Sequence, residues 1–293
     1  MTRGQKAVAA VDRTPFVPAD IWVPTEETGW LVPLNRYREP DRWRRCVDAD
    51  EPIVTAVEFD PRIPQHLRNP ETGRGVVATS SSSKPGVMAA MLDALEPDED
   101  MRALEIGTGT GYNAAVISHI TGPGTVTSVE VAPGVADAAR AALDATGFEV
   151  EVVTGDGNDG YPPGAPYDRV IVTAAVRHIP YAWVEQCSPG AVIVAPWAPV
   201  FHPDSPLAIV HVGEDGHAAG TFTGSAPFMP LDGEATTPAE ADAVHAKWKE
   251  MGRPDPERFG ITIAPQGQRV WLDTPDQPLT AGTAGIVTGP TLP

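Results

Sequence analysis

Apolar residues recur with regular spacing between residues 84 and 195, and this spacing predicts strands that alternate with helices. Short apolar runs predict strands over 102–106, 125–131, 149–154, 168–173 and 191–195. Helical periodicity predicts helices over 85–95, 112–120, 134–146 and 181–186. This order indicates an α/β fold, with a mostly parallel sheet covered by helices on both faces.

The two ends of the chain lack this regular alternation. Residues 12–75 are rich in Pro and Trp, and we expect an irregular, lid-like segment with a helix over 40–47, a strand over 53–57 and a loop over 66–75. Beyond residue 196 the pattern predicts strands over 207–212 and 220–223, a helix over 240–251, a hairpin of 260–264 with 268–272, and a frayed tail over 281–293. We therefore expect three regions, 1–77, 78–198 and 199–293.

Composition narrows the class of ligand. The chain has 293 residues, 42% of them hydrophobic, and a net charge of -18. Such an acidic surface repels nucleic acids and anionic membranes, and it suits a peptide or a small cationic ligand better. The only cysteines, Cys46 and Cys187, are too far apart for a metal or redox pair, and no targeting or membrane segment is evident, so we expect a cytoplasmic protein.

The strongest chemical signal is a glycine-rich turn, EIGTGTG at 105–111, between a predicted strand and a predicted helix. Glycines let the backbone approach a ligand closely, and the helix N-terminus then presents N–H groups to it. A dinucleotide fingerprint would need glycine where Tyr112 stands, which argues against a nicotinamide cofactor. Glu105 places an anion beside the turn, which suits a cationic ligand.

Three further motifs belong with this turn. Glu130 ends the next predicted strand, where a carboxylate can accept both hydroxyls of a ribose. Asp156 lies between two glycines and can accept from an adenine amino group, although Gly-Asp-Gly is also a common turn. The serine run 79–83 before Lys84 and Pro85 is either a helix cap or a hydroxyl-lined loop touching cofactor and substrate.

These motifs, in this order, resemble the protein-L-isoaspartate O-methyltransferases. The matching segments are 81–85 (SSSKP), 104–112 (LEIGTGTGY), 128–130 (SVE), 155–157 (GDG), 167–175 (YDRVIVTAA) and 179–180 (IP). The resemblance implies a class I S-adenosylmethionine-dependent methyltransferase fold over 78–198, with S-adenosylmethionine as cofactor and S-adenosylhomocysteine as product. It makes Ser83 the active-site serine.

The resemblance also assigns the remaining site residues. Gly107, Thr108 and Gly109 would hold the methionine end, with Glu105 near its amino group. The full set expected to bind the cofactor is Ser81, Ser82, Glu105, Gly107, Thr108, Gly109, Gly111, Glu130, Val131, Asp156 and Gly157. Thr173 is expected at the substrate, and no metal is expected because the seven histidines lack metal-ligand spacing.

The chain differs from the repair enzymes in its additions. Residues 19–77 are longer than the corresponding segment, and about 95 residues follow Ala198. With 180–186 (PYAWVEQ) and 268–273 (QRVWLD), these additions resemble an actinobacterial branch found beside ribosomal-peptide maturases. That branch methylates an Asp of a cyclised lanthipeptide or graspetide, and the ester then closes to a succinimide. This resemblance favours peptide maturation, with general isoaspartate repair and small-molecule O- or N-methylation as alternatives.

The expected chemistry needs few catalytic groups. A peptide carboxylate, with an ordinary pKa of about 4, is already ionised at neutral pH and needs no general base. Ser83 would align it by a hydrogen bond, and exclusion of water would favour the loss of both charges. Arg42, Arg44 and Arg45 belong to the one basic patch, which is either a contact for an acidic peptide or a solvated helix face.

Overall fold

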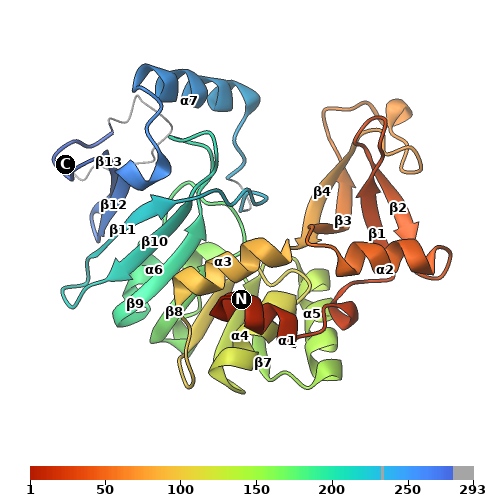
Figure 1. Ribbon diagram of the computed structural model, residues 1–293, viewed down its shortest axis with the longest axis horizontal. Coiled ribbons are helices and arrows are strands. Elements are labelled where there is room, and N and C mark those ends of the chain that lie inside the picture. Colours follow the sequence, from red (N-terminus) through yellow and green to blue (C-terminus); the bar gives the residue numbers. More distant parts are fainter. Residues whose placement is uncertain (232–233, 280–293) are drawn as a thin grey trace.

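The computed structural model describes residues 1–231 and 234–279, which form two sheets with flanking helices (Figure 1). The larger sheet has nine strands: β5 (Ala103–Ile106), β6 (Val126–Glu130), β7 (Val150–Thr154), β8 (Tyr167–Val172), β9 (Cys187–Pro196), β10 (Leu207–Val212), β11 (Ala218–Thr223), β12 (Phe259–Ala264) and β13 (Gly267–Leu272). Their spatial order is β13-β12-β11-β10-β9-β8-β5-β6-β7. Each of these strands was predicted, with ends that differ by a few residues.

The larger sheet is mixed. Strands β7, β6, β5, β8 and β9 are parallel to one another, and β10 to β13 continue the sheet in antiparallel order. The antiparallel half is built from the region expected as a separate C-terminal extension, 199–293. Its strands therefore extend the parallel half of the same sheet.

Helices cover both faces of this sheet, unequally. On one face lie α1 (Arg3–Ala10), α3 (Pro85–Leu95), α4 (Tyr112–Thr121) and α5 (Pro133–Thr146). On the other lies α6 (Tyr181–Glu185). Each face of the sheet has its own hydrophobic core, and successive side chains of a strand enter the two cores in turn. Ala103 and Ile171 belong to the first core, on the face covered by α1, α3, α4 and α5. Leu104 and Val170 belong to the second core, on the face covered by α6.

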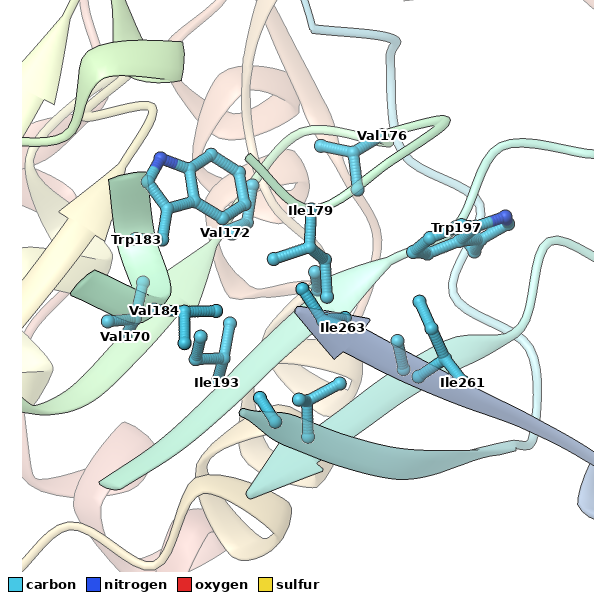
Figure 2. Close-up of a cluster of buried hydrophobic side chains, with 14 of the residues drawn as sticks. Val170, Val172, Val176, Ile179, Trp183, Val184, Ile193, Trp197, Ile261 and Ile263 are labelled. Carbon is cyan, nitrogen blue, oxygen red and sulfur yellow. The ribbon is translucent and has the colours of Figure 1, made fainter. Parts of the chain in front are cut away.

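The second core joins the parallel and antiparallel halves. Figure 2 shows Ile261 and Ile263 of β12 in the same cluster as Ile193 of β9 and Trp183 of α6. All four side chains are essentially buried. Helix α7 (Pro238–Glu250) lies at the far end of the antiparallel half (Figure 1). Burial of this continuous core couples the C-terminal strands to the strands that carry the site.

The smaller sheet forms a lobe to one side of the larger one (Figure 1). Its strands, in spatial order, are β2 (Leu31–Asn35), β1 (Asp20–Pro24), β3 (Ile53–Phe59) and β4 (Val76–Ser82), and α2 (Pro40–Asp48) packs on them. The lobe has a small core of its own, made of Val17, Ile21, Leu34, Trp43, Val47 and Ile53. The expected helix 40–47 and the strand at 53–57 are confirmed, whereas α1, β1, β2 and β4 were not predicted.

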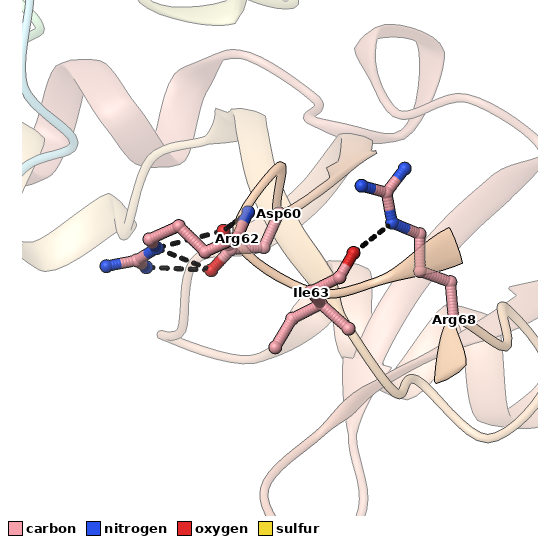
Figure 3. Close-up of polar contacts among 4 residues, drawn as sticks. All are labelled: Asp60, Arg62, Ile63 and Arg68. Carbon is pink, nitrogen blue, oxygen red and sulfur yellow. Dashed lines mark hydrogen bonds and ion pairs between the residues drawn. The ribbon is translucent and has the colours of Figure 1, made fainter. Parts of the chain in front are cut away.

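The connection between β3 and β4 is a long surface loop, as expected for 66–75. Arg62 binds the carboxylate of Asp60 at its start, with an Nη2–Oδ2 distance of 2.7 Å (Figure 3). This hydrogen bonding lowers the pKa of Asp60 to about 2. Arg68 donates from Nε to the Ile63 carbonyl at 2.7 Å, which folds the loop back on itself (Figure 3).

Three further sequence expectations concern a membrane segment, the C-terminal tail and the boundary between two regions. Within 1–231 and 234–279, no helix is long and apolar enough to cross a membrane. The tail expected to fray, 281–293, lies outside the described residues. The expected boundary between residues 77 and 78 falls inside β4, so the serine run begins within the strands of the lobe.

Candidate active site

The predicted cofactor motifs meet at one edge of the larger sheet. Because β5, β6, β7 and β8 are parallel, their carboxyl ends lie together. The glycine turn follows β5, Glu130 ends β6, Asp156 follows β7 and Thr173 follows β8. Motifs that are up to about 70 residues apart in sequence thus form one site.

The glycine turn has a backbone that only glycine adopts readily. Gly107, Gly109 and Gly111 have φ angles of +94°, +53° and +82°. A Cβ on Gly107 would lie 2.6 Å from Oγ1 of Thr173. Thr173 in turn donates to the carbonyls of Ile106, at 3.1 Å, and of Gly107. The turn is therefore held against the end of β8, with no space for a side chain at its first position.

Glu105 lies beneath this turn and is fully buried. Its carboxylate accepts from Ser128 Oγ at 2.5 Å and from Asn113 Nδ2 at 2.8 Å. Thr108 joins the network through Ser128, with a distance of 2.7 Å between the hydroxyl oxygens. Burial raises the pKa of Glu105 to about 7, against the lowering effect of the two hydrogen bonds. Glu105 is therefore expected to ionise at a higher pH than an exposed glutamate does.

Glu130, the last residue of β6, holds the glycine turn through its side chain. Its carboxylate accepts from the backbone N–H of Gly109 at 3.0 Å and of Ala132 at 3.1 Å. The neighbouring Val131 is 53% exposed and adds an apolar surface beside this carboxylate. An acid next to an exposed apolar surface matches the polar ribose and the flat adenine of a nucleoside.

The Gly-Asp-Gly motif, which follows β7, forms the wall next to Glu130, since the Gly155 N–H donates to the Glu130 carbonyl at 3.0 Å. Asp156 is exposed and accepts from the backbone N–H of Asn158 at 2.9 Å. Gly157 is buried, and a Cβ there would lie 2.6 Å from Ile106 Cγ2. Its carbonyl accepts from Trp183 Nε1 at 2.8 Å, a contact from α6 that no local motif indicated. This wall is held by side chains from two other elements.

The serine run was expected to be either a helix cap or a hydroxyl-lined loop, and most of it is instead the end of β4, with no side-chain cap hydrogen bond at the start of α3. Ser81 and Ser82 are the last residues of β4, paired with Val54 and Ile53 of β3, because pairing satisfies their backbone groups. The run still reaches the glycine turn, since a Cβ on Gly109 would lie 3.3 Å from the Ser81 carbonyl. Ser83 follows the strand and is half-buried, with no hydrogen-bond partner for its hydroxyl among the described residues.

A segment from the C-terminal part of the chain also borders the site. The Leu231 N–H donates to the Ala175 carbonyl, and the Ala175 N–H donates to the Met229 carbonyl, both at 2.8 Å. Leu231 lies beside Gly157, with Cδ1 3.7 Å from the position of a Cβ there. Sequence reasoning missed this contact because the residues concerned are far apart in the chain.

The arginine patch lies away from the glycine turn, on exposed positions of α2. Arg42 contacts Glu39 at 3.4 Å, and Arg44 contacts Asp48 at 2.8 Å. Arg45 is also exposed. Asp50, just after α2, accepts from the N–H of Gly86 at 2.6 Å, so the end of α2 adjoins the start of α3 and the serine run.

The residues at this edge fit S-adenosylmethionine. The side-chain-free turn leaves room for close approach, and Glu105 supplies a buried acceptor for a cationic group. Asn113 adds a second acceptor, because its buried Oδ1 has no hydrogen-bond partner within the described part of the chain. Glu130 and Val131 offer the polar and apolar surfaces that a nucleoside needs. Which of these atoms touch the cofactor stays a prediction.

Fold and site together define a class I S-adenosylmethionine-dependent methyltransferase. A sequence model of the family described as "Protein-L-isoaspartate(D-aspartate) O-methyltransferase (PCMT)" matches residues 60–236. The chain therefore belongs to the protein-L-isoaspartate(D-aspartate) O-methyltransferase family. The match extends past residue 198 and includes the segment around Leu231.

Curated relatives agree with this assignment. Protein-L-isoaspartate O-methyltransferase 2 of Archaeoglobus fulgidus is 36% identical over 211 residues, covering 68% of this chain and 94% of its own. Protein-L-isoaspartate O-methyltransferase of Pyrococcus abyssi is 38% identical over 209 residues, covering 66% of this chain and 96% of its own. Both relatives are matched over nearly their whole length.

A solved structure shares the fold of almost the whole chain. A protein-L-isoaspartate O-methyltransferase superimposes with a TM-score of 0.61 at 20% sequence identity, covering 93% of this chain and 96% of that chain. Most of the segments taken as additions at 19–77 and 199–293 thus have a counterpart in that fold. The additions therefore do not by themselves give this chain a different fold from that structure.

Proposed function

We propose that this protein methylates the free α-carboxylate of L-isoaspartyl residues in peptides or proteins, using S-adenosylmethionine. The observation that carries the proposal is the contact between the end of β4 and the glycine turn. Ser81 borders Gly109, and Ser83 follows with its hydroxyl free among the described residues. A cofactor cradle and a hydrogen-bond donor for a carboxylate are thereby neighbours.

The chain's own groups would bind and align the two reactants. The cofactor, when bound, supplies an electrophilic methyl group. Ser83 donates a hydrogen bond to one oxygen of the substrate carboxylate, which leaves the other oxygen as the nucleophile. No base is required, because the carboxylate is ionised at neutral pH. The protein contributes orientation, and it excludes water from a step that neutralises two charges.

The identity of the peptide is decided by a paired assay. One substrate is a linear peptide with a single isoaspartyl residue, and the other is a macrocyclic peptide with one Asp inside the ring. Mass spectrometry follows the gain of a methyl group and the later loss of methanol. We expect turnover of the linear peptide, whereas turnover of the cyclic peptide alone would support the maturation enzyme predicted from the actinobacterial resemblance.

Replacing Ser83 by Ala is expected to lower kcat/KM for the isoaspartyl peptide by about 10- to 100-fold, because one hydrogen bond to a charged group is lost. The dissociation constant for the cofactor, measured by calorimetry, should not change. Ser80→Ala is the matched control, since Ser80 lies on the same strand and its Oγ accepts from Thr55 at 3.3 Å. A parallel loss of cofactor affinity in Ser83→Ala would instead make Ser83 a cofactor residue.

We also propose that the lobe recognises the peptide through α2. Replacing Arg42, Arg44 and Arg45 by Ala should raise KM for an isoaspartyl peptide with acidic flanks several-fold and leave kcat unchanged, because surface charges steer encounter and contribute little to alignment. Added salt should produce the same change in the parent protein. Arg62→Ala is the control, and an unchanged KM in the triple variant would contradict this role.

A further inference from the structure

Arg13 is a buried arginine at the start of the turn that follows α1. The residue is only 6% exposed, and all five N–H groups of its guanidinium donate hydrogen bonds. Nε donates to Ser82 Oγ at 3.0 Å, Nη2 to the carbonyls of Ser82 and Ser83 at 2.9 Å each, and Nη1 to the carbonyls of Ala49 and Glu51 at 3.4 and 3.2 Å.

These partners are an unusual choice for a buried cation. In the described part of the chain, each is a carbonyl or a hydroxyl, and none is a carboxylate. Burial accordingly lowers the pKa of Arg13 to about 10, which still leaves it charged at neutral pH. The Asp50 carboxylate is near enough to act against this lowering of the pKa, but it does not hydrogen-bond the guanidinium. Burying the charge is therefore costly, and its presence indicates a requirement other than stability alone.

The contacts of Arg13 converge on the residues that precede α3. Two of its donors hold the backbone of Ser82 and Ser83, where the strand of the lobe ends and the site begins. Two others hold the connection between α2 and β3. Because the guanidinium is planar and rigid, these bonds fix the two backbone segments in one geometry.

The same N-terminal segment also contacts the helix behind the glycine turn. Tyr112 opens α4, and its hydroxyl lies 3.0 Å from the Val8 carbonyl and 3.3 Å from the Val11 carbonyl. Residues 8–13 therefore join the helix that follows the glycine turn to the backbone of Ser83. No other segment among the described residues makes side-chain hydrogen bonds to both the Ser83 backbone and Tyr112.

We propose that Arg13 is a positioning residue that sets the distance between Ser83 and the glycine turn, and so aligns the substrate carboxylate for methyl transfer. It acts through the backbone of Ser83 and touches neither substrate nor cofactor. The proposal rests on the isoaspartyl methyltransferase function proposed above. It adds a requirement for the guanidinium fork, which a lysine cannot reproduce.

The test is a double-mutant cycle between Arg13→Lys and Ser83→Ala, read on kcat with the isoaspartyl peptide. Arg13→Lys keeps the charge and loses the fork, and we expect kcat to fall roughly 10- to 100-fold, as for a small misplacement of a reacting group. Cofactor affinity should stay within about twofold of the parent value. In the Ser83→Ala background, Arg13→Lys should have almost no further effect, because Arg13 acts through Ser83.

A merely structural role predicts a different pattern. The losses of the two variants would then multiply in the double variant, and cofactor affinity would fall together with kcat. Either result, or an unchanged kcat in Arg13→Lys, overturns the proposal. Arg3→Lys is the control, because Arg3 lies on the same N-terminal segment, is about half exposed and pairs with Asp98 at 2.7 Å.

Amide hydrogen exchange keeps this test separate from the proposed function. Whatever peptide the parent protein methylates, Arg13→Lys should speed exchange at residues 82–88 and leave residues 112–121 as in the parent. Unchanged exchange at 82–88 contradicts the positioning role. An inactive parent protein with the expected exchange pattern would contradict the proposed function alone.

Discussion

Replacing Glu105 by Gln is expected to stabilise the cofactor-free protein at pH 8 and to weaken cofactor binding at the same pH. The stabilisation arises because Glu105 is fully buried and its pKa is raised to about 7. Gln has nearly the same shape and can keep the contacts with Asn113 and Ser128, without a charge to desolvate.

The pH dependence of this effect has a definite sign. An acid whose pKa is higher in the folded than in the unfolded protein binds more protons when folded. The free energy of unfolding therefore falls as pH rises from about 4.5, the ordinary pKa of a glutamate, to about 7, and above pH 7 the full cost of ionising the buried carboxyl remains. That cost is roughly 3 kcal/mol. Urea unfolding should thus show Glu105→Gln gaining on the parent between pH 5 and 8 and no difference below about pH 4.5.

Cofactor binding should change in the opposite direction. An ionised Glu105 attracts the cationic methionine amino group, so the parent should bind the cofactor more tightly as pH rises through about 7. Glu105→Gln should lose this dependence and about 10-fold or more of affinity at pH 8. Glu149→Gln is the control, because Glu149 is exposed at the opposite end of the sheet. Equal affinities for Glu105→Gln and the parent would place the amino group elsewhere.

Replacing Gly107 by Ala is expected to destabilise the protein by roughly 3 kcal/mol and to lower cofactor affinity about 100-fold. Two effects combine, the positive φ of +94° and the approach of Cβ to 2.6 Å from Thr173 Oγ1. The turn would have to move away from β8, and the cradle for the cofactor would change with it. Calorimetric titration and urea unfolding measure the two losses.

A matched glycine separates these two effects. Gly147 has a φ of +76° at the end of α5, and a Cβ there would meet nothing within 4 Å. Gly147→Ala should therefore cost only roughly 1–2 kcal/mol and leave cofactor affinity unchanged. Adding Thr173→Ala to Gly107→Ala removes the close contact and should recover part of the stability. A double variant no more stable than Gly107→Ala would attribute the whole loss to φ.

The alternating strands and helices between residues 84 and 195 could be predicted from the sequence because the patterns that identify them are local. Helix α3 was predicted with its observed ends, since its apolar spacing and Pro85 both lie within the element. Strands β1, β2 and β4 of the lobe could not be predicted in this way. Strands β1 and β2 each bury a single residue, so neither shows the alternation that identifies a strand. Likewise, β4 is polar over much of its length and is defined by its pairing with β3.

The site residues also fall into two groups, those with a local sequence motif and those placed only by tertiary contacts. The glycine turn, Glu130 and the Gly-Asp-Gly motif are short local patterns, and the parallel strands gather them at one edge as expected. Arg13 had no such signal, because its partners Ser82 and Ser83 lie about 70 residues further along the chain. The contact of Trp183 with Gly157 likewise depends on how α6 packs against the turn at 157–159. Tertiary contacts of this kind leave no trace in a single sequence.

The separate small core of the lobe has a consequence for how this protein unfolds. A cluster of six buried residues offers little stabilisation, so the lobe should open at a lower free energy than the nine-stranded sheet. Unfolding would then occur in two steps, and one midpoint would not describe it. Three of the seven tryptophans, at 22, 30 and 43, belong to the lobe, so their fluorescence mixes both transitions. The cooperativity of the sheet is better followed at the amides of β5, which report its global opening.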